Sequence, residues 1–318
     1  MDPEATNYDD KAKEDDGSCA YESASTTLSG DISSDLTLDA SLEYTLAGGV
    51  HVLDGVTLTI PAGTMIKSDP DESVAYLIIE QGGMIDAQGS ASDPIVFTSG
   101  ASSPAAGDWG GIILCGKAPI NSGSLATAEV GDVTYGGSSS TDNSGTLRYV
   151  RVEYTGNAIN DEKEHNGFTF NGVGSGTTVE YLQAFMGNDD GFEFFGGSVS
   201  ADYLVSTGSG DDCFDWTYGW VGSGSYWIAE QADGVGDRGI EADNNGDNNS
   251  ASPFSNPTLE NITLTGYIGS ESDGMKLREG TKGDISNVLI SNFKDGVEVE
   301  HEVTVKNAGS GELALSGI

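Results

Sequence analysis

Hydrophobic residues occur in short runs from about residue 25 onward, and Gly, Asn, Asp and Ser separate the runs. The segments VTLTIPAGTMIKS (56–68), AYLIIEQGGMIDAQGS (75–90) and DPIVFTSG (93–100) are either alternating or continuously hydrophobic. No long stretch repeats its hydrophobic residues every 3.6 positions, so the pattern predicts many short β-strands and almost no helix. Because β-sandwiches also consist of short strands, internal repeats must decide between architectures.

Six segments in the second half of the chain share one pattern, in which a polar and a small residue precede a hydrophobic, a polar and a second hydrophobic residue. They begin at Asn166, Asp190, Asp212, Arg238, Asp273 and Asp295, at successive spacings of 24, 22, 26, 35 and 22 residues. A second strand-like segment, such as TLRYVRVEY or TVEYLQAFM, lies between consecutive copies. Such regularity is typical of a solenoid. It predicts an all-β, right-handed parallel β-helix over residues 25–300, with coils of about 22–26 residues.

The repeated pattern also predicts which side chains face the core. Strand residues alternate between two faces, and equivalent residues of neighbouring coils stack about 4.8 Å apart. The positions expected in the core are Phe168, Phe170, Phe192, Phe194, Phe214, Trp216, Ile240, Met275, Leu277, Val297 and Val299. The positions expected to point outward are Thr169, Glu193, Asp215, Glu241, Lys276 and Glu298. The Gly in most copies is expected to form a tight corner with positive φ, which Gly adopts at low cost.

Charge narrows the choice of partner. The 318 residues include 51 Asp and Glu against 13 Lys and Arg, which gives a net charge of -38. We expect no nucleic acid partner, because binding to phosphates depends on Lys and Arg, and anionic lipid is disfavoured for the same reason. The charge favours cations as ligands and an extracellular medium. No run approaches the roughly 18 apolar residues of a membrane-spanning helix, so no transmembrane segment is expected.

Two neighbouring segments, GNDDGFEFFGG (187–197) and GSGDDCFDWTYG (208–219), each place an Asp pair ahead of an aromatic residue, an acid and a second aromatic residue. Their acids should lie on adjacent coils and repel each other unless water, Lys or a cation intervenes. Calcium suits such an edge better than magnesium because it accepts irregular sets of oxygen ligands. The candidate metal ligands are Asp189, Asp190, Glu193, Asp211, Asp212, Asp215 and Glu241. The alternative is that the Asp-Asp-Gly segments only form the corners of the coils.

The same two segments resemble the N-T-D and G-D-D segments of polygalacturonase-type β-helix enzymes. The resemblance implies Asp190, Asp211 and Asp212 as catalytic carboxylates of an inverting hydrolase. Other parts of that pattern are missing: His51, His165 and His301 do not form a Gly-His-Gly, and MKLRE (275–279) matches an Arg-x-Lys clamp only loosely. A calcium-assisted lyase would need a basic residue beside the metal, for which Arg238 is the candidate. We therefore favour a non-catalytic role.

The first 24 residues differ in character from the rest of the chain. The stretch DPEATNYDDKAKEDDGSCAYE (2–22) is acidic and poor in aliphatic residues, so it cannot form a packed unit alone. It resembles a short module of exported and surface-anchored proteins of Bacteroidetes-type bacteria, in which a second Cys stands ahead of the Asp-Pro. Here Met1 occupies that region, so Cys19 is expected to lack its partner. The resemblance leaves open membrane anchoring through a lipid-modified N-terminal Cys.

Asp9, Asp15 and Asp16 in this module have the spacing of calcium ligands, with a solvated acidic linker as the alternative.

Aromatic residues crowd the region from Trp216 to Trp227. By alternation Trp216 belongs to the core, which leaves Tyr218 and Trp220 as candidates for stacking on sugar rings at the surface. Anchoring of the core or of a loop is the alternative for both. Cys115 and Cys213 are interpreted as small buried residues rather than nucleophiles.

Four segments, AGDWGGIILCGKAPIN, NSGTLRYVRVEYTG, HNGFTFNGVGSGTTVEYLQ and NDDGFEFFGG, together resemble the β-helix domain of secreted or surface-attached Bacteroidetes-type proteins. The resemblance covers about residues 28 to 300 and implies fold and location more than activity. Residues 301–318 are expected to form cap strands or to begin a following domain. We therefore expect an extracellular or outer cell-surface scaffold that binds calcium and has a glycan or a surface protein as partner. The alternative is a polysaccharide-degrading glycoside hydrolase or lyase.

Overall fold

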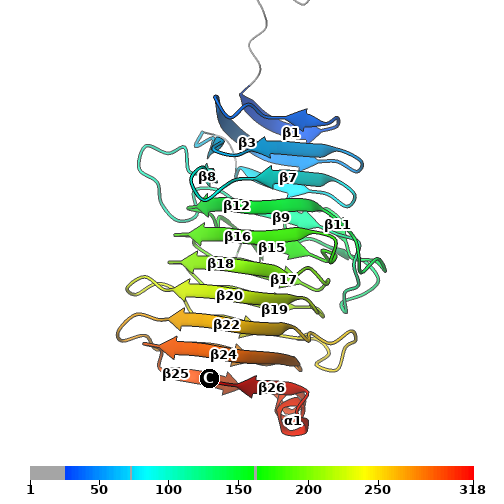
Figure 1. Cartoon of the computed structure of the whole chain (residues 1–318), viewed down its shortest axis with the longest axis vertical. Helices are drawn as coiled ribbons and strands as arrows, with labels where there is room; N and C mark the ends of the chain where they lie inside the picture. Colours follow the sequence, from blue (N-terminus) through cyan, green and yellow to red (C-terminus); the bar gives the residue numbers. More distant parts are fainter. Residues whose placement is uncertain (1–25, 72–73, 161–162) are drawn as a thin grey trace, which may run out of the picture.

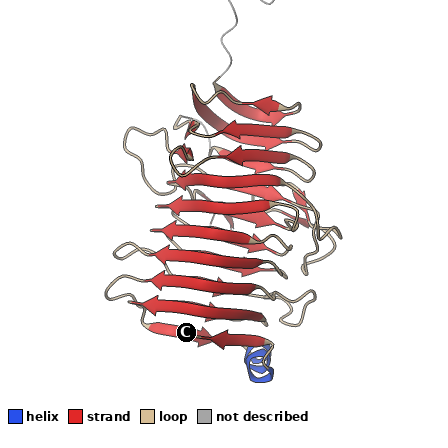
Figure 2. Cartoon of the chain, in the orientation of Figure 1, coloured by secondary structure: helices blue, strands red, loops and turns tan. Residues whose placement is uncertain are grey.

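The computed structural model describes residues 26–71, 74–160 and 163–318, and these residues form a parallel β-helix, as predicted. Successive coils lie one under another from the N-terminal to the C-terminal end, and the strands of one coil pair in parallel with those of the next (Figure 1). Strands and connecting loops account for almost all of the described part, which contains one helix at the C-terminal end (Figure 2).

The strands form three parallel sheets that run along the axis. The first sheet consists of β2 (Leu36–Thr37), β4 (Thr57–Pro61), β7 (Met84–Gln88), the leading halves of β12 (Gly145–Glu153), β16 (Thr178–Phe185), β18 (Ala201–Thr207), β20 (Ser223–Glu230), β22 (Thr258–Thr265) and β24 (Gly283–Ser291), and β26 (Leu313–Ser316). The second sheet consists of the leading parts of β1 (Thr27–Ile32) and β3 (Glu43–Val52), then β5 (Met65–Ser68), β8 (Ile95–Thr98) and the trailing halves of β12, β16, β18, β20, β22 and β24.

The third sheet carries the repeated segments. It consists of the trailing parts of β1 and β3, then β6 (Tyr76–Ile79), β9 (Ile112–Cys115), β15 (Phe168–Asn171), β17 (Phe192–Phe195), β19 (Phe214–Thr217), β21 (Ile240–Ala242), β23 (Asp273–Leu277) and β25 (Asp295–Val299). The pairs Phe168–Phe192, Phe192–Phe214, Phe214–Ile240, Ile240–Met275 and Met275–Val297 are in register, which confirms the alignment of all six copies.

The predicted core positions lie inside the β-helix. All from Phe168 to Leu277 are fully buried, whereas Val297 and Val299 are only partly buried because they belong to the last full coil. The phenylalanine rings of adjacent coils stack: the centroids of Phe168 and Phe192 are 5.1 Å apart. Cys115 and Cys213 are free thiols and fully buried, as predicted.

The repeated glycines were expected to form tight corners with positive φ, and this expectation is wrong. Gly191 and Gly274 do not have positive φ. Instead, a Cβ atom on Gly191 would lie 2.4 Å from the Ser206 Oγ atom, and one on Gly274 would lie 2.4 Å from the Ile290 Cγ2 atom. Glycine is therefore required by the close approach of the third sheet to the side chains opposite it, rather than by a corner.

The C-terminal segment was expected to form strands, but its first part is the helix α1 (Glu302–Ser310). Thr304 and Asn307, which lie three residues apart on one helix face, are buried. The Thr304 hydroxyl accepts a hydrogen bond from the Gly280 N–H, and the Asn307 amide donates to the Gly280 carbonyl oxygen. These contacts favour a helix over a strand because they fix one helix face to the turn above it. The strand β26 then pairs with β24.

A loop covers the outer face of the third sheet in its upper coils. This loop includes the short hairpin of β10 (Ala126–Thr127) and β11 (Thr134–Tyr135). Outward-facing Ile78 and Ile113 of the sheet join Val130, Tyr135 and Phe195 in a second hydrophobic cluster beneath the loop. A second hairpin, β13 (Ala158–Asn160) and β14 (Lys163–Glu164), precedes β15. The outward positions of the sheet become polar from Thr169 downward, where the candidate site lies.

Candidate metal centre

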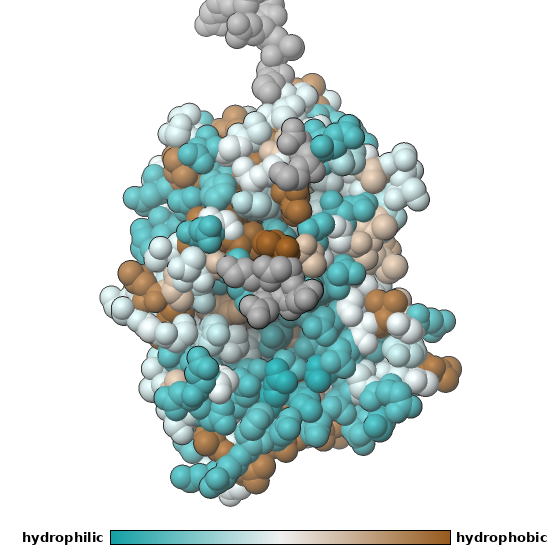
Figure 3. Space-filling view, turned by 180° about the vertical axis from the view of Figure 1, so that it is seen from behind, coloured by the Kyte–Doolittle hydropathy of each residue, from teal (hydrophilic) through white to brown (hydrophobic). Residues whose placement is uncertain are grey.

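Five of the seven acids predicted as metal ligands on the third sheet, all except Asp212 and Glu241, line a cavity of about 220 Å³, called the acidic pocket below. Its lining residues are Glu129, Glu164, Asn166, Asp189, Asp190, Glu193, Asp211 and Asp215. Glu129 comes from the loop between β10 and β11, and Glu164 comes from β14, so the pocket lies between the sheet and these two connections. The face seen in Figure 3, opposite to that of Figure 1, is broadly hydrophilic over its lower coils.

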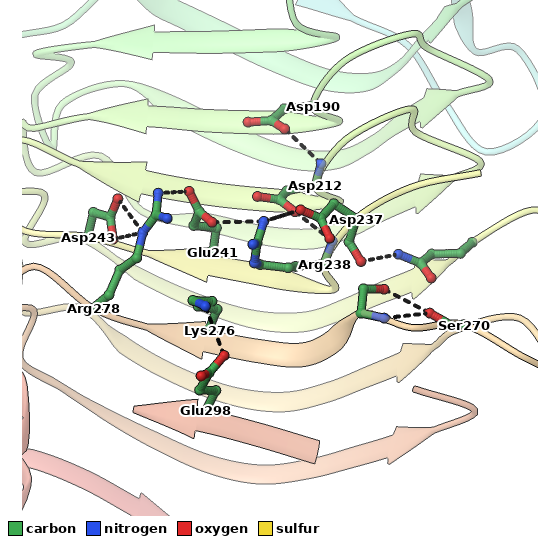
Figure 4. Close-up of polar contacts among 12 residues, drawn as sticks. Asp190, Asp212, Asp237, Arg238, Glu241, Asp243, Ser270, Lys276, Arg278 and Glu298 are labelled. Atoms are coloured by element: carbon green, nitrogen blue, oxygen red, sulfur yellow. Dashed lines mark hydrogen bonds and ion pairs between the residues drawn. The ribbon is translucent and has the colours of Figure 1, made fainter. Parts of the chain in front are cut away.

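Two of the repeated acids connect one coil to the next. The Asp190 Oδ1 atom accepts a hydrogen bond from the Asp212 N–H over 2.8 Å (Figure 4). The Asp212 Oδ1 atom in turn accepts one from the Arg238 N–H over 2.6 Å. These residues are the first positions of three consecutive copies of the repeat. These contacts support the structural interpretation of the Asp pairs, because each buried carboxylate accepts a hydrogen bond from a main-chain N–H of the next coil.

The outward acids gather into three groups that each have the geometry to hold a metal ion. The groups are Asp189, Asp190 and Asp211; Asp190, Glu193 and Asp215; and Asp211, Asp212 and Asp237. Within each group, one carboxylate oxygen of every residue lies within 4.8 Å of the others. Asp190 and Asp211 each belong to two groups, so the candidate ligands form one continuous patch rather than separate sites.

Asn166 offers the pocket a neutral oxygen. It is only 4% exposed. Its amide nitrogen donates to Glu193 Oε2 over 2.5 Å and to Thr169 Oγ1 over 3.3 Å, whereas its Oδ1 atom has no hydrogen-bond partner. The Asp215 Oδ1 atom is likewise buried without a partner. Unsatisfied buried oxygens are costly, and oxygens of this kind are the ligands that calcium prefers.

Burial and mutual repulsion disfavour charge on these acids. Burial raises the pKa of Asp190, Glu193 and Asp215 well above the usual values, and neighbouring carboxylates raise it further. Burial, with Glu164 and Asp211 nearby, raises the pKa of Asp189 to about 8. Among the described residues that line the pocket there is no Lys or Arg. Without a cation, the charged forms of these carboxyl groups are therefore disfavoured.

Glu241, predicted as a metal ligand on the next coil, is instead paired with arginine. Its carboxylate lies 3.1 Å from the Arg238 Nη1 atom and also contacts Arg278. Arg278 Nε donates to both oxygens of Asp243, over 2.9 and 3.1 Å (Figure 4). Two arginines therefore lie beside the acids of this coil. These ion pairs neutralise acids in the lower part of the face.

Further down the face, Lys276 pairs with Glu298 and Glu300, at 2.8 and 3.1 Å.

The sequence analysis did not predict four residues of the site: Glu129, Glu164, Asn166 and Asp237. The repeat alignment held a signal for two of them. Asn166 occupies the position of Asp190 in the first copy, and Asp237 precedes Arg238 as Asp189 precedes Asp190.

The aromatic surface site predicted from sequence is wrong at Trp220. This side chain is fully buried, donates its indole N–H to the Val199 carbonyl oxygen over 3.0 Å and stacks on Phe194. Trp220 packs inside because the chain turns back into the core after β19. Tyr218 is partly buried against Phe195 at the edge of the second cluster, as expected for a loop anchor. The candidates Asp9, Asp15 and Asp16, with Cys19, lie outside the described residues.

Comparison with known proteins shows that the chain is a β-helix protein. Residues 30–318 match the family described as the pectate-lyase like beta helix domain, and the chain belongs to this family. A solved structure similar to it is the full-length tailspike protein 2 of Escherichia coli O157:H7 bacteriophage CAB120, with 12% identity and a TM-score of 0.33. That match covers 86% of this chain and 36% of the tailspike chain. None of the curated proteins compared with the chain matches it. No helix in the described residues has the length and hydrophobicity to cross a membrane.

Proposed function

We propose that the chain is an extracellular or cell-surface β-helix scaffold whose acidic pocket binds a hard divalent cation, calcium. The observation that carries the proposal is the set of Asp190, Glu193 and Asp215, whose carboxylate oxygens lie within 4.8 Å of one another. The unpaired Oδ1 atom of the buried Asn166 adds a neutral ligand beside them. Carboxylate and amide oxygens at irregular positions suit calcium, which takes six to eight oxygen ligands.

The net charge supports both parts of this proposal. A charge of -38 raises the local concentration of cations around the protein. Calcium-binding modules that work outside cells have dissociation constants of about 10⁻⁴–10⁻³ M. We expect the same range here, because part of the coordination must come from water.

A direct test is titration of chelator-treated protein with calcium chloride in a calorimeter. The variant Glu193→Gln with Asp215→Asn should bind calcium at least about tenfold more weakly. Asp284→Asn, which removes an exposed carboxylate from β24 of the first sheet, is the matched control and should bind as the native chain does. Sodium chloride of equal ionic strength should not replace calcium. Equal calcium affinity in the native chain and the double variant would contradict the proposed site.

A polysaccharide-degrading enzyme is the second candidate, and one observation favours it. The pKa of about 8 at Asp189 leaves this carboxyl group protonated at neutral pH, as a general acid requires, and it faces other carboxylates in a pocket. Of the acids implied by the resemblance to polygalacturonases, Asp190 and Asp212 each accept a main-chain hydrogen bond of the next coil. Only Asp211 is exposed. The pair for catalysis would therefore be Asp189 and Asp211.

Incubation with a panel of polysaccharides, followed by assays of reducing ends and unsaturated products, tests this candidate. Activity that Asp189→Asn and Asp211→Asn abolish, and that Asp284→Asn retains, would favour the enzyme over the scaffold.

A further inference from the structure

A row of tyrosines follows the corner at which the first sheet passes into the second. Tyr149, Tyr181, Tyr203 and Tyr226 lie at equivalent positions of β12, β16, β18 and β20, with φ angles between 49° and 61°. The equivalent residues in β22 and β24 are Asn261 and Asn287. Asn adopts this left-handed conformation more readily than Tyr because its short polar side chain can form hydrogen bonds with the local backbone. The backbone alone therefore does not account for four tyrosines.

The rings of this row stack on one another along the axis. The centroids of consecutive rings are 4.4, 4.3 and 5.0 Å apart, and the planes lie within 10° of parallel. Stacking stabilises each pair, which offsets part of the backbone strain. Because the ring faces cover one another, the row presents ring edges and hydroxyl groups to solvent, with Tyr203 40% and Tyr226 50% exposed.

An apolar groove of about 300 Å³ runs beside the row. Its other walls are Leu182, Gln183, Val205 and Ile228. Val205 and Ile228 pair across adjacent strands at outward positions of the second sheet, and Ile228 is 47% exposed. Outward positions of a solvated sheet are normally polar, so exposed aliphatic side chains beside an aromatic row mark a binding surface. Stacking explains the row of tyrosines, but it does not explain this groove.

The charge of the groove indicates its ligand. None of its eight lining residues is charged, although the chain has a net charge of -38. Arg148 lies over the rings of Tyr149 and Tyr181, but it is paired with Glu180 at 3.4 Å. A polyanion is repelled by the protein as a whole, and a cation is attracted to the acidic groups on the third sheet. The lining offers a neutral ligand walls that are almost entirely apolar, and the only polar side-chain groups among the lining residues are the tyrosine hydroxyls and the Gln183 amide.

Sugar chains combine apolar C–H surfaces with hydroxyl groups, and so match this lining. We propose that the groove binds an uncharged polysaccharide chain that lies along the helix axis. This site is separate from the acidic pocket and needs no metal ion. It also places carbohydrate binding on residues other than Tyr218 and Trp220.

Native gel electrophoresis through soluble glucan, xylan and mannan tests the proposal, with polygalacturonate as the anionic probe. The test variant is Tyr203→Asn with Tyr226→Asn, which should fold because Asn261 and Asn287 already occupy the same corner. Tyr154→Asn, a left-handed tyrosine outside the groove, is the matched control. Glu193→Gln in the acidic pocket separates this site from the proposed cation site.

We expect at least one neutral polysaccharide to retard the native chain and both controls. The double variant should bind that polysaccharide at least about tenfold more weakly, with an unchanged unfolding midpoint. The proposal is overturned if no neutral polysaccharide retards the protein, if polygalacturonate binds more tightly, or if the double variant binds as the native chain does. Sedimentation of both proteins covers a further outcome: a native dimer that the double variant loses would make the groove an interface between copies and overturn the proposal.

Discussion

The carboxylate of Asp190 accepts a hydrogen bond from the main-chain N–H of Asp212, 22 residues further along the chain and one coil below it. Asp212 repeats the contact with the N–H of Arg238. Each contact gives a buried donor at the start of a strand a partner in the neighbouring coil. A side chain at this position therefore contributes to stability mainly through its oxygen, and its negative charge is secondary.

Two substitutions at Asp190 separate the oxygen from the charge. Asp190→Ala leaves the Asp212 N–H unpaired and should lower the free energy of unfolding by about 1–3 kcal/mol. Asp190→Asn keeps an oxygen acceptor and removes a carboxylate whose pKa burial raises, so in chelator it should be neutral or stabilising. Denaturant unfolding at constant pH measures both. Equal losses for the two variants would mean that the hydrogen bond is not what matters.

A second prediction concerns the faces of the strand β17. Phe192 stacks between Phe168 and Phe214, with centroids 5.1 and 5.5 Å away, so Phe192→Ala should cost about 3–5 kcal/mol. Glu193→Gln removes an outward, half-buried carboxylate and should be neutral or mildly stabilising in chelator. Unfolding midpoints in the reverse order would place the wrong face of the strand inside.

The repeated glycines allow a test with an internal control. A Cβ atom on Gly191 would lie 2.4 Å from the Ser206 Oγ atom, whereas one on Gly296, the equivalent residue of the last copy, would meet nothing within 4 Å. Gly191→Ala should therefore destabilise the chain by about 1–3 kcal/mol through overpacking. Gly296→Ala should be neutral or slightly stabilising because alanine restricts the unfolded chain. Thermal unfolding of the two variants gives the comparison, and equal shifts would show that contact with Ser206 is not the reason for glycine.

The fold was predictable because stacked coils require equivalent residues at regular spacings, and the six copies of the repeat show these spacings in the sequence. The same regularity placed Asp190, Glu193 and Asp215 on adjacent coils. It could not place Glu129 or Glu164, because these residues belong to loops and hairpins outside the coil, whose paths no periodicity determines. Six of the eight residues that line the pocket thus belong to the coils, and two belong to insertions.

The aromatic residues show a different limit. The crowding of Trp216, Tyr218 and Trp220 suggested that some of these rings form a surface site. Their burial depends on the direction in which the chain turns after a strand, and this direction cannot be predicted from composition. The exposed tyrosines, such as Tyr203 and Tyr226, occupy equivalent positions in the strands that lie between copies of the repeat. That position is a bend within the strand, so simple alternation does not assign its side chain to a face.

The last prediction concerns the effect of pH on the metal-free protein. The pKa of Asp189 is about 8 in the folded chain and about 4 in the unfolded chain, so between these values the folded state binds more protons. Its contribution to stability must then fall as pH rises. His165 acts in the opposite direction at lower pH, since burial lowers its pKa to about 4. The window from about pH 6.5 to about pH 8 therefore isolates the acids.

In chelator, the unfolding midpoint should decrease from about pH 6.5 to about pH 8, and Asp189→Asn should make the decrease smaller. Saturating calcium should also reduce it, because a bound cation replaces the protons that the carboxyl groups otherwise hold. Denaturant titrations at several pH values in this window, with chelator or calcium, give the comparison, and Asp284→Asn serves as the control. A midpoint that rises with pH in chelator would show that the pocket carboxylates are already charged and stabilised by the protein itself, which removes the electrostatic reason for a cation.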